Sequence, residues 1–144
     1  MEDELLVGLN DYKILDKKHP VAYTRDISTC IVVLIHRLKS SALLNIESYK
    51  DSIEIGHFID LLEKQKDNPI VKVEIFKGYH TNMGNLSVIK FILHRLNLDY
   101  DEYFVFRNGS NETSLGYNYL TQEHLMARMD KGNPILRVRK PKNK

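Results

Sequence analysis

The sequence contains almost no cysteine: Cys30 is the only one among 144 residues. A single cysteine excludes an intramolecular disulfide and a zinc site built from several thiolates. It also favours a reducing compartment, so we expect a cytoplasmic protein. The N-terminal residues 1–13 are acidic and do not resemble a signal peptide. No apolar run approaches membrane-spanning length, and we expect no insertion into a membrane.

The sequence also has little excess charge, with a formal net charge of +2. That excess is concentrated at the C-terminus, where "RVRKPKNK" carries five basic residues and no acidic one. A short basic terminus of this kind is usually solvated, and it does not by itself indicate binding to nucleic acid. We therefore predict a single domain over residues 1–134, followed by a basic tail over residues 135–144, and no nucleic-acid partner.

The first part of the chain consists of short apolar segments bounded by polar or turn residues. Several of them are rich in β-branched side chains, which is typical of strands. The segments predicted as strands cover residues 5–9, 20–24, 30–35 and 42–46.

Two segments have apolar residues at helical spacing, and they predict helices over about residues 54–66 and 85–96. Their apolar stripes contain Ile55, Phe58, Ile59 and Leu62 in the first helix, and Leu86, Ile89, Leu93 and Leu96 in the second. Between them, residues 70–76 alternate as a strand does, and three more strand-like segments follow at residues 102–108, 114–120 and 123–129. Early strands, two helices and late strands predict an α/β fold arranged as a layered sandwich.

Cys30 opens the apolar run "CIVVLI" and is a candidate nucleophile. A thiol at its ordinary pKa of about 8.5 is mostly protonated at neutral pH, so catalysis requires a base or a positively charged neighbour. His36 has the same strand parity, but six strand residues span roughly 20 Å. The alternative is that Cys30 is a small buried hydrophobic residue.

The remaining histidines do not form an evident metal site. His19, His94 and His124 are predicted to lie on the surface, and no Asp or Glu stands at ligand spacing from them. No phosphate loop, dinucleotide fingerprint or paired-carboxylate signature is present. We therefore predict neither a metal nor a cofactor.

Several segments between about residue 5 and residue 130 follow one another in an order and spacing typical of a known family. The first two are "VGLNDYKIL" and "AYTRDISTCIVV". They are followed by the helix "IEIGHFIDLLEK", the strand and loop "VKVEIFKGYHTNMGN", the helix "NLSVIKFILHRLNL" and the closing hairpin within residues 106–129. In this order the chain resembles CheD, the chemoreceptor glutamine deamidase family of bacterial chemotaxis, with "VGLNDYKIL" similar to its opening strand and "AYTRDISTCIVV" similar to its nucleophile segment.

The resemblance implies a layered α-β sandwich of the type shared by CheD and the catalytic domains of cytotoxic necrotizing factors. It also implies that Cys30 attacks the side-chain amide of a protein glutamine and releases ammonia, after which water hydrolyses the thioester to leave glutamate. Thr24 would orient the catalytic imidazole, and backbone amides near Ser28 and Cys30 would stabilise the oxyanion.

The chain departs from the family pattern at the position of the catalytic histidine, which Asn45 occupies. We expect residues 30–35 and 42–46 to pair as antiparallel strands, which would place Cys30 and Asn45 near each other at one end. An amide cannot accept the thiol proton, and loss of one member of a comparable triad costs on the order of 10⁴-fold or more. His80 in the loop "KGYHTNMGN" is the best candidate for a replacement base. Its alternative role is that of an ordinary loop histidine.

Three functions remain open from the sequence. The first is a protein-glutamine glutaminase that acts on a chemoreceptor or another protein. The second is a CheD-like regulatory module that has lost catalysis and still binds partners such as a CheC-type phosphatase. The third is a cysteine hydrolase with a different protein substrate, because a fold alone does not determine function.

Overall fold

The structure is a computed structural model, and it describes residues 6–24, 29–48, 53–78, 80–105, 113–130 and 133–138. For residue 113 and for residues 126–130 and 133–138 only the backbone is described. Within these ranges no helix is long and apolar enough to cross a membrane.

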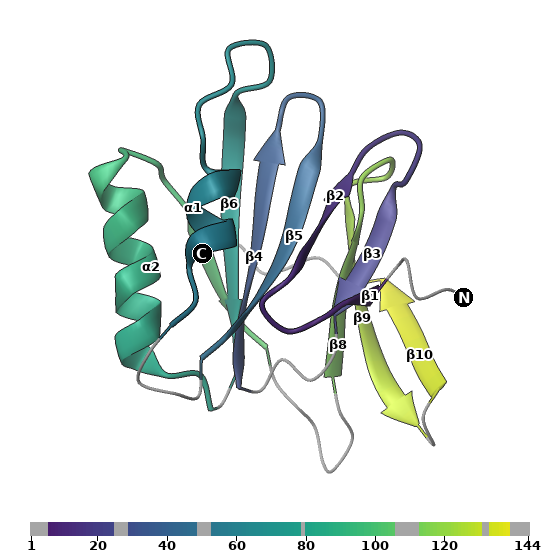
Figure 1. Cartoon of the computed structure of the whole chain (residues 1–144). Helices are drawn as coiled ribbons and strands as arrows, with labels where there is room; N and C mark the ends of the chain where they lie inside the picture. The colour runs from purple at the N-terminus through teal and green to yellow at the C-terminus, as the bar shows by residue number, and fades with distance from the viewer. Residues whose placement is uncertain are drawn as a thin grey trace.

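In the described part of the chain, two five-stranded sheets and two helices form three layers (Figure 1). The first sheet has the strand order β1-β3-β8-β9-β10 and the second has the order β2-β5-β4-β6-β7. Both helices pack on one face of the second sheet, while the first sheet covers its other face. The α/β class predicted from the sequence is therefore confirmed at this level.

The first sheet contains the N-terminal and C-terminal strands of the described chain. β1 is parallel to β3, and the other neighbours in this sheet are antiparallel. Its members are β1 (Leu6–Val7), β3 (Val21–Thr24), β8 (Thr113–Asn118), β9 (Glu123–Asp130) and β10 (Asn133–Val138). β10 was not predicted as a strand, and it includes residues 135–138, which we had assigned to the basic tail. β10 pairs with β9 along the whole length of β10, so these residues belong to the sheet.

The second sheet forms the middle layer. β4 pairs with β5 and β6 in antiparallel register, β2 pairs with β5, and β7 lies parallel to β6. Its members are β2 (Tyr12–Leu15), β4 (Cys30–Arg37), β5 (Ser41–Glu47), β6 (Ile70–Lys77) and β7 (Asp101–Phe104). The predicted antiparallel pairing of residues 30–35 with 42–46 is confirmed.

The helices are α1 (Gly56–Leu61) and α2 (Met83–Arg95). Both were predicted, but α1 ends at Leu61 and not near residue 66. The buried stripe is also narrower than expected, because Ile59 and Leu96 are about half exposed. The two ends of α2 are capped. At its start the side chain of Asn82 accepts a hydrogen bond from the amide of Asn85, and at its end Asn97 adopts φ 57° in a Schellman turn.

The core has two parts, one on each face of the second sheet. Ile31, Val33 and Ile35 of β4 pack against the helices, with Phe58 of α1 among their neighbours. The alternate residues of β4 pack between the sheets with side chains such as Phe76. Because both faces of β4 are covered, all eight of its residues are buried, as the unbroken apolar run in the sequence indicates.

Gly116 of β8 allows the strand to lie close to β3. A Cβ atom at this position would stand 2.7 Å from the backbone oxygen of Ala22 and 2.9 Å from Cβ of Tyr23. We expect Gly116→Ala to lower the free energy of unfolding by about 1 to 3 kcal/mol, as overpacking in a core does. The matched control is Gly8→Ala, because a Cβ at Gly8 would meet no atom within 4 Å. Urea unfolding curves of equal midpoint for the two variants would contradict this account of β8.

Candidate functional site

β4 places polar residues at both of its ends on the same face. Val32 and Leu34 belong to the core between the sheets, so Cys30 and His36, which share their parity, also face the first sheet. Six strand residues separate the two side chains by roughly 20 Å. The strand therefore supports two separate polar clusters between the sheets.

At the Cys30 end, Thr24 and Asn45 connect the two sheets. The amide Nδ2 of Asn45 donates a hydrogen bond to Oγ1 of Thr24 at 2.5 Å, and Thr24 Oγ1 donates to the backbone oxygen of Val7 at 3.0 Å. Asn45 lies opposite Val32 in the pairing of β4 with β5, so it is a diagonal neighbour of Cys30. Diagonal neighbours are typically about 7 to 8 Å apart. The sequence prediction that Cys30 and Asn45 meet at one end of this pair agrees with that register.

The backbone around Cys30 is held by neighbouring hydroxyl groups. The oxygen of Thr29 accepts from both the amide and the hydroxyl of Ser48, at 3.2 Å and 2.7 Å. The oxygen of Cys30 accepts from Oγ1 of Thr81 at 3.0 Å. The start of β4 is therefore attached both to the segment that follows β5 and to the loop that precedes α2.

As a nucleophile, Cys30 is expected from the sequence to be at least partly accessible, at the mouth of a shallow cleft beside Thr24 and Asn45. This expectation is wrong. Cys30 is only 1% exposed, because it begins β4 within the sheet and faces the interior between the layers. A polar group near its sulfur is Oγ1 of Thr29, at 3.9 Å. A hollow of about 690 Å³ does exist, but its lining residues, such as Leu62, Ile70 and Ile92, belong to the helix side.

The other predicted site residues have different positions. His80 lies in the turn between β6 and α2 and is exposed. Its neighbour Thr81 contacts the backbone of Cys30, so the loop that contains His80 lies next to the start of β4. Ser28, which the resemblance associates with the oxyanion, is outside the described residues.

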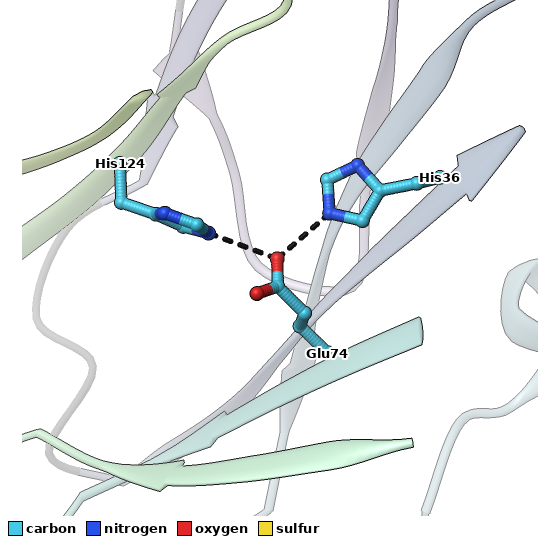
Figure 2. Close-up of side chains that lie close together, drawn as sticks. All are labelled: His36, Glu74 and His124. Carbon is cyan, nitrogen blue, oxygen red and sulfur yellow. Dashed lines mark hydrogen bonds and ion pairs between the residues drawn. The ribbon is translucent and has the colours of Figure 1, made fainter. Parts of the chain in front are cut away.

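At the other end of β4, His36 and His124 share one carboxylate oxygen (Figure 2). Nε2 of His36 lies 2.7 Å from Oε1 of Glu74, and Nε2 of His124 lies 2.8 Å from the same oxygen. The three side chains come from β4, β6 and β9, so the cluster connects both sheets. Glu74 is 1% exposed, and both histidines are also buried.

Protons on the two imidazoles make this arrangement possible. Burial on its own raises the pKa of Glu74, but hydrogen bonds from His124 and His36 outweigh burial and lower that pKa to about 2. The carboxylate is therefore ionised and can only accept hydrogen bonds, so each Nε2 must carry a proton. Nδ1 of His36 lies 2.8 Å from Oγ of Ser41, which fixes the second side of that ring.

Tyr117 packs against both imidazole rings. Its ring centroid lies 4.8 Å from that of His36 and 5.1 Å from that of His124. Burial and the nearby charge of Glu74 raise the pKa of Tyr117 to about 12. The tyrosine is therefore neutral and forms a wall of the cluster.

The sequence prediction that His124 lies on the surface is wrong, since the residue is 8% exposed. The predictions for His19 and His94 are confirmed, because both are exposed. The sequence showed no Asp or Glu at ligand spacing from the histidines. The fold nevertheless brings Glu74 and the two imidazoles together, with candidate ligand atoms within 4.8 Å of one another. Glu74 is 38 positions from His36 and 50 positions from His124, so no short sequence motif indicated that they meet. The sequence feature that could have indicated a polar cluster is Glu74 itself, a charged residue within the strand pattern "VKVEIF".

The burial of Cys30 predicts that its thiol reacts slowly with alkylating reagents. Iodoacetamide should alkylate the native protein far more slowly than the protein in 6 M guanidinium, because the sulfur of the native protein must first become exposed. Mass spectrometry measures the two rates. Since Cys30 is the only cysteine, every alkylated molecule reports on this position. Native alkylation at the denatured rate would contradict the buried position.

The shared carboxylate predicts a pH-dependent stability. The pKa of Glu74 is about 2 in the folded chain and 4.5 in a model compound, so the ionised form stabilises the fold above pH 4.5. We expect this stabilisation, on the order of 3 kcal/mol, to disappear as the pH falls from 4.5 towards 2. Denaturant unfolding in buffer with EDTA measures it. Glu74→Gln should be less stable than the native chain at pH 6 and should lack this part of the pH dependence, whereas parallel pH profiles would contradict the assignment.

A comparison with models of known protein families found no match, and a comparison with curated proteins found none either. A functional assignment for this chain therefore depends on its own residues, on their geometry and on the sequence resemblance described above.

Proposed function

We propose that this chain is a CheD-like module that has lost deamidase activity and acts by binding a protein partner. The observation that carries the proposal is the hydrogen bond from Asn45 to Thr24. The resemblance gives this position to the catalytic histidine and gives Thr24 the task of orienting it. Here the amide of Asn45 donates to Thr24, and an amide has no basic nitrogen to receive a thiol proton.

The burial of Cys30 supports the same function. A nucleophile must reach the carbonyl carbon of its substrate, and a sulfur in a residue that is 1% exposed cannot approach a glutamine of another protein without movement of its neighbours. Access to Cys30 is therefore reduced.

The layered fold supports a retained binding role. Two sheets with two helices on one outer face agree with the sandwich that the resemblance implies. Under this proposal a chemoreceptor or a CheC-type phosphatase is the partner, and the chain regulates it through binding. Titration calorimetry with a purified CheC-type phosphatase tests that role, and absence of binding to both partner types would argue against it.

A slow deamidase is the second candidate, and one contact favours it. Thr81 donates to the backbone oxygen of Cys30, so His80, the adjacent residue, belongs to a loop that touches the nucleophile segment. If that loop moves, an exposed imidazole becomes available to accept the thiol proton. This candidate predicts activity that depends on both Cys30 and His80.

Deamidation assays separate the two functions. The chain is incubated with receptor peptides that contain glutamine, and the conversion of amide to acid is followed by mass spectrometry. We expect the native chain to show no more conversion than Cys30→Ala, and Asn45→His to gain activity because it restores a base beside Thr24. Asn45→Leu is the matched control, since it removes the same hydrogen bond without supplying a base.

Two outcomes would contradict the proposed loss of catalysis. Strong activity of the native chain that disappears in Cys30→Ala would show that the thiol works as it stands. A further loss in His80→Ala, with no change in the exposed control His94→Ala, would identify His80 as the base.

A further inference from the structure

We propose that His36, Glu74 and His124 form a binding site for a divalent transition-metal ion of the zinc type. This site is separate from the Cys30 end of β4 and does not depend on the function proposed for that end. Two imidazoles and one carboxylate are ligands that zinc and similar first-row ions accept. The three side chains meet between the sheets, as Figure 2 shows.

The spacing of the ligand atoms is close to what an ion requires. Bonds of about 2.0 to 2.2 Å at angles between 90° and 109° separate neighbouring ligand atoms by about 3.0 to 3.4 Å. The two nitrogen-to-oxygen distances are 2.7 Å and 2.8 Å, so each must lengthen by only a few tenths of an ångström. The candidate ligand atoms lie within 4.8 Å of one another, so the pair that is farthest apart must approach by up to about 1.4 Å when an ion binds.

Two buried atoms of the cluster have unused bonding capacity. Oε2 of Glu74 and Nδ1 of His124 have no hydrogen-bond partner among the described residues. A buried polar atom without a partner is costly, and a bound ion satisfies Oε2 when the carboxylate turns towards it. An ion bound to Nε2 of His124 supplies no partner for Nδ1 of that ring. Lys72 Nζ lies 3.6 Å from Oε2. That side chain is half exposed and also lies 4.0 Å from Asp101, which can hold it when an ion takes its place.

Ser41 provides the outer contact that a metal-bound histidine needs. When an ion binds Nε2 of His36, the proton of the neutral ring moves from Nε2 to Nδ1, which then donates to Oγ of Ser41 over the present 2.8 Å. Such contacts fix the ring and the tautomer of a ligating histidine. Ser41 is 3% exposed and follows a tight connection from β4, so its position is well defined.

Charge also favours a cation at this position. Glu74 Oε1 accepts hydrogen bonds from both imidazoles, and the carboxylate lies between two sheets with little contact with water. A divalent ion bound there offsets the charge of the carboxylate, and the Nε2 protons of the two rings move to Nδ1. Three protein ligands leave at least one coordination position for water or another small ligand.

Zinc binding to the metal-free chain tests the site. After EDTA treatment and dialysis, we expect the chain to bind one equivalent of Zn²⁺ in a competition assay with a chromophoric chelator. Ser41→Ala should weaken this binding by about 10- to 100-fold, as loss of an outer contact does, and Glu74→Gln and His124→Gln should weaken it further. The double variant with His19→Gln and His94→Gln is the control, and it should bind as the native chain does.

Nuclear magnetic resonance of the native chain provides a test that does not require the variants to fold. Addition of Zn²⁺ should remove the Nε2 protons of His36 and His124 and shift the resonances of these two rings, while those of His19 and His94 stay unchanged. A structural cluster without a metal would show no change at one equivalent, and shifts at the exposed histidines alone would indicate surface binding. Either result would overturn the proposal.

Discussion

The fold depends on the burial of β4 on both of its faces. Its alternate residues supply one core with the helices and another core with the first sheet, and each buried aliphatic side chain contributes roughly 1.5 to 3 kcal/mol. A strand in this position has no face open to water. Any polar residue on β4 must therefore find a partner inside the protein, and this requirement explains why both ends of the strand carry polar clusters.

The two clusters differ in what their chemistry allows. At the Cys30 end, Nδ2 of Asn45 donates to Thr24 and the thiol is buried, an arrangement that connects the sheets without supplying a base, while Oδ1 of Asn45 has no partner among the described residues. At the other end, His36 and His124 converge on one ionised carboxylate. Only this second cluster combines basic nitrogen atoms with a buried charge, and it lies outside the region that the resemblance to CheD marks as functional.

Local patterns in the sequence predicted most of the elements, because strand alternation and helical spacing depend on neighbouring residues. Strands such as β4 and β6 and both helices were predicted in this way, whereas β2 and β10 were not. β2 is held by pairing with β5, which lies farther along the chain, and β10 pairs with β9, the strand directly before it. The meeting of Thr24 with Asn45 came from the resemblance. The cluster around Glu74 could not be predicted, because its members lie on three strands and only the packing of the two sheets brings them together.

The central claim is that β4 brings buried polar groups of both sheets together. Its most direct test is to determine which ring nitrogen of His36 and of His124 carries the proton in the metal-free protein. Long-range proton–nitrogen correlation spectra at neutral pH report which nitrogen of each ring carries the proton. The account predicts Nε2 protons on both rings that exchange slowly with water, because each is buried and donates to Glu74. Rapidly exchanging, averaged signals like those of the exposed His19 and His94 would contradict it.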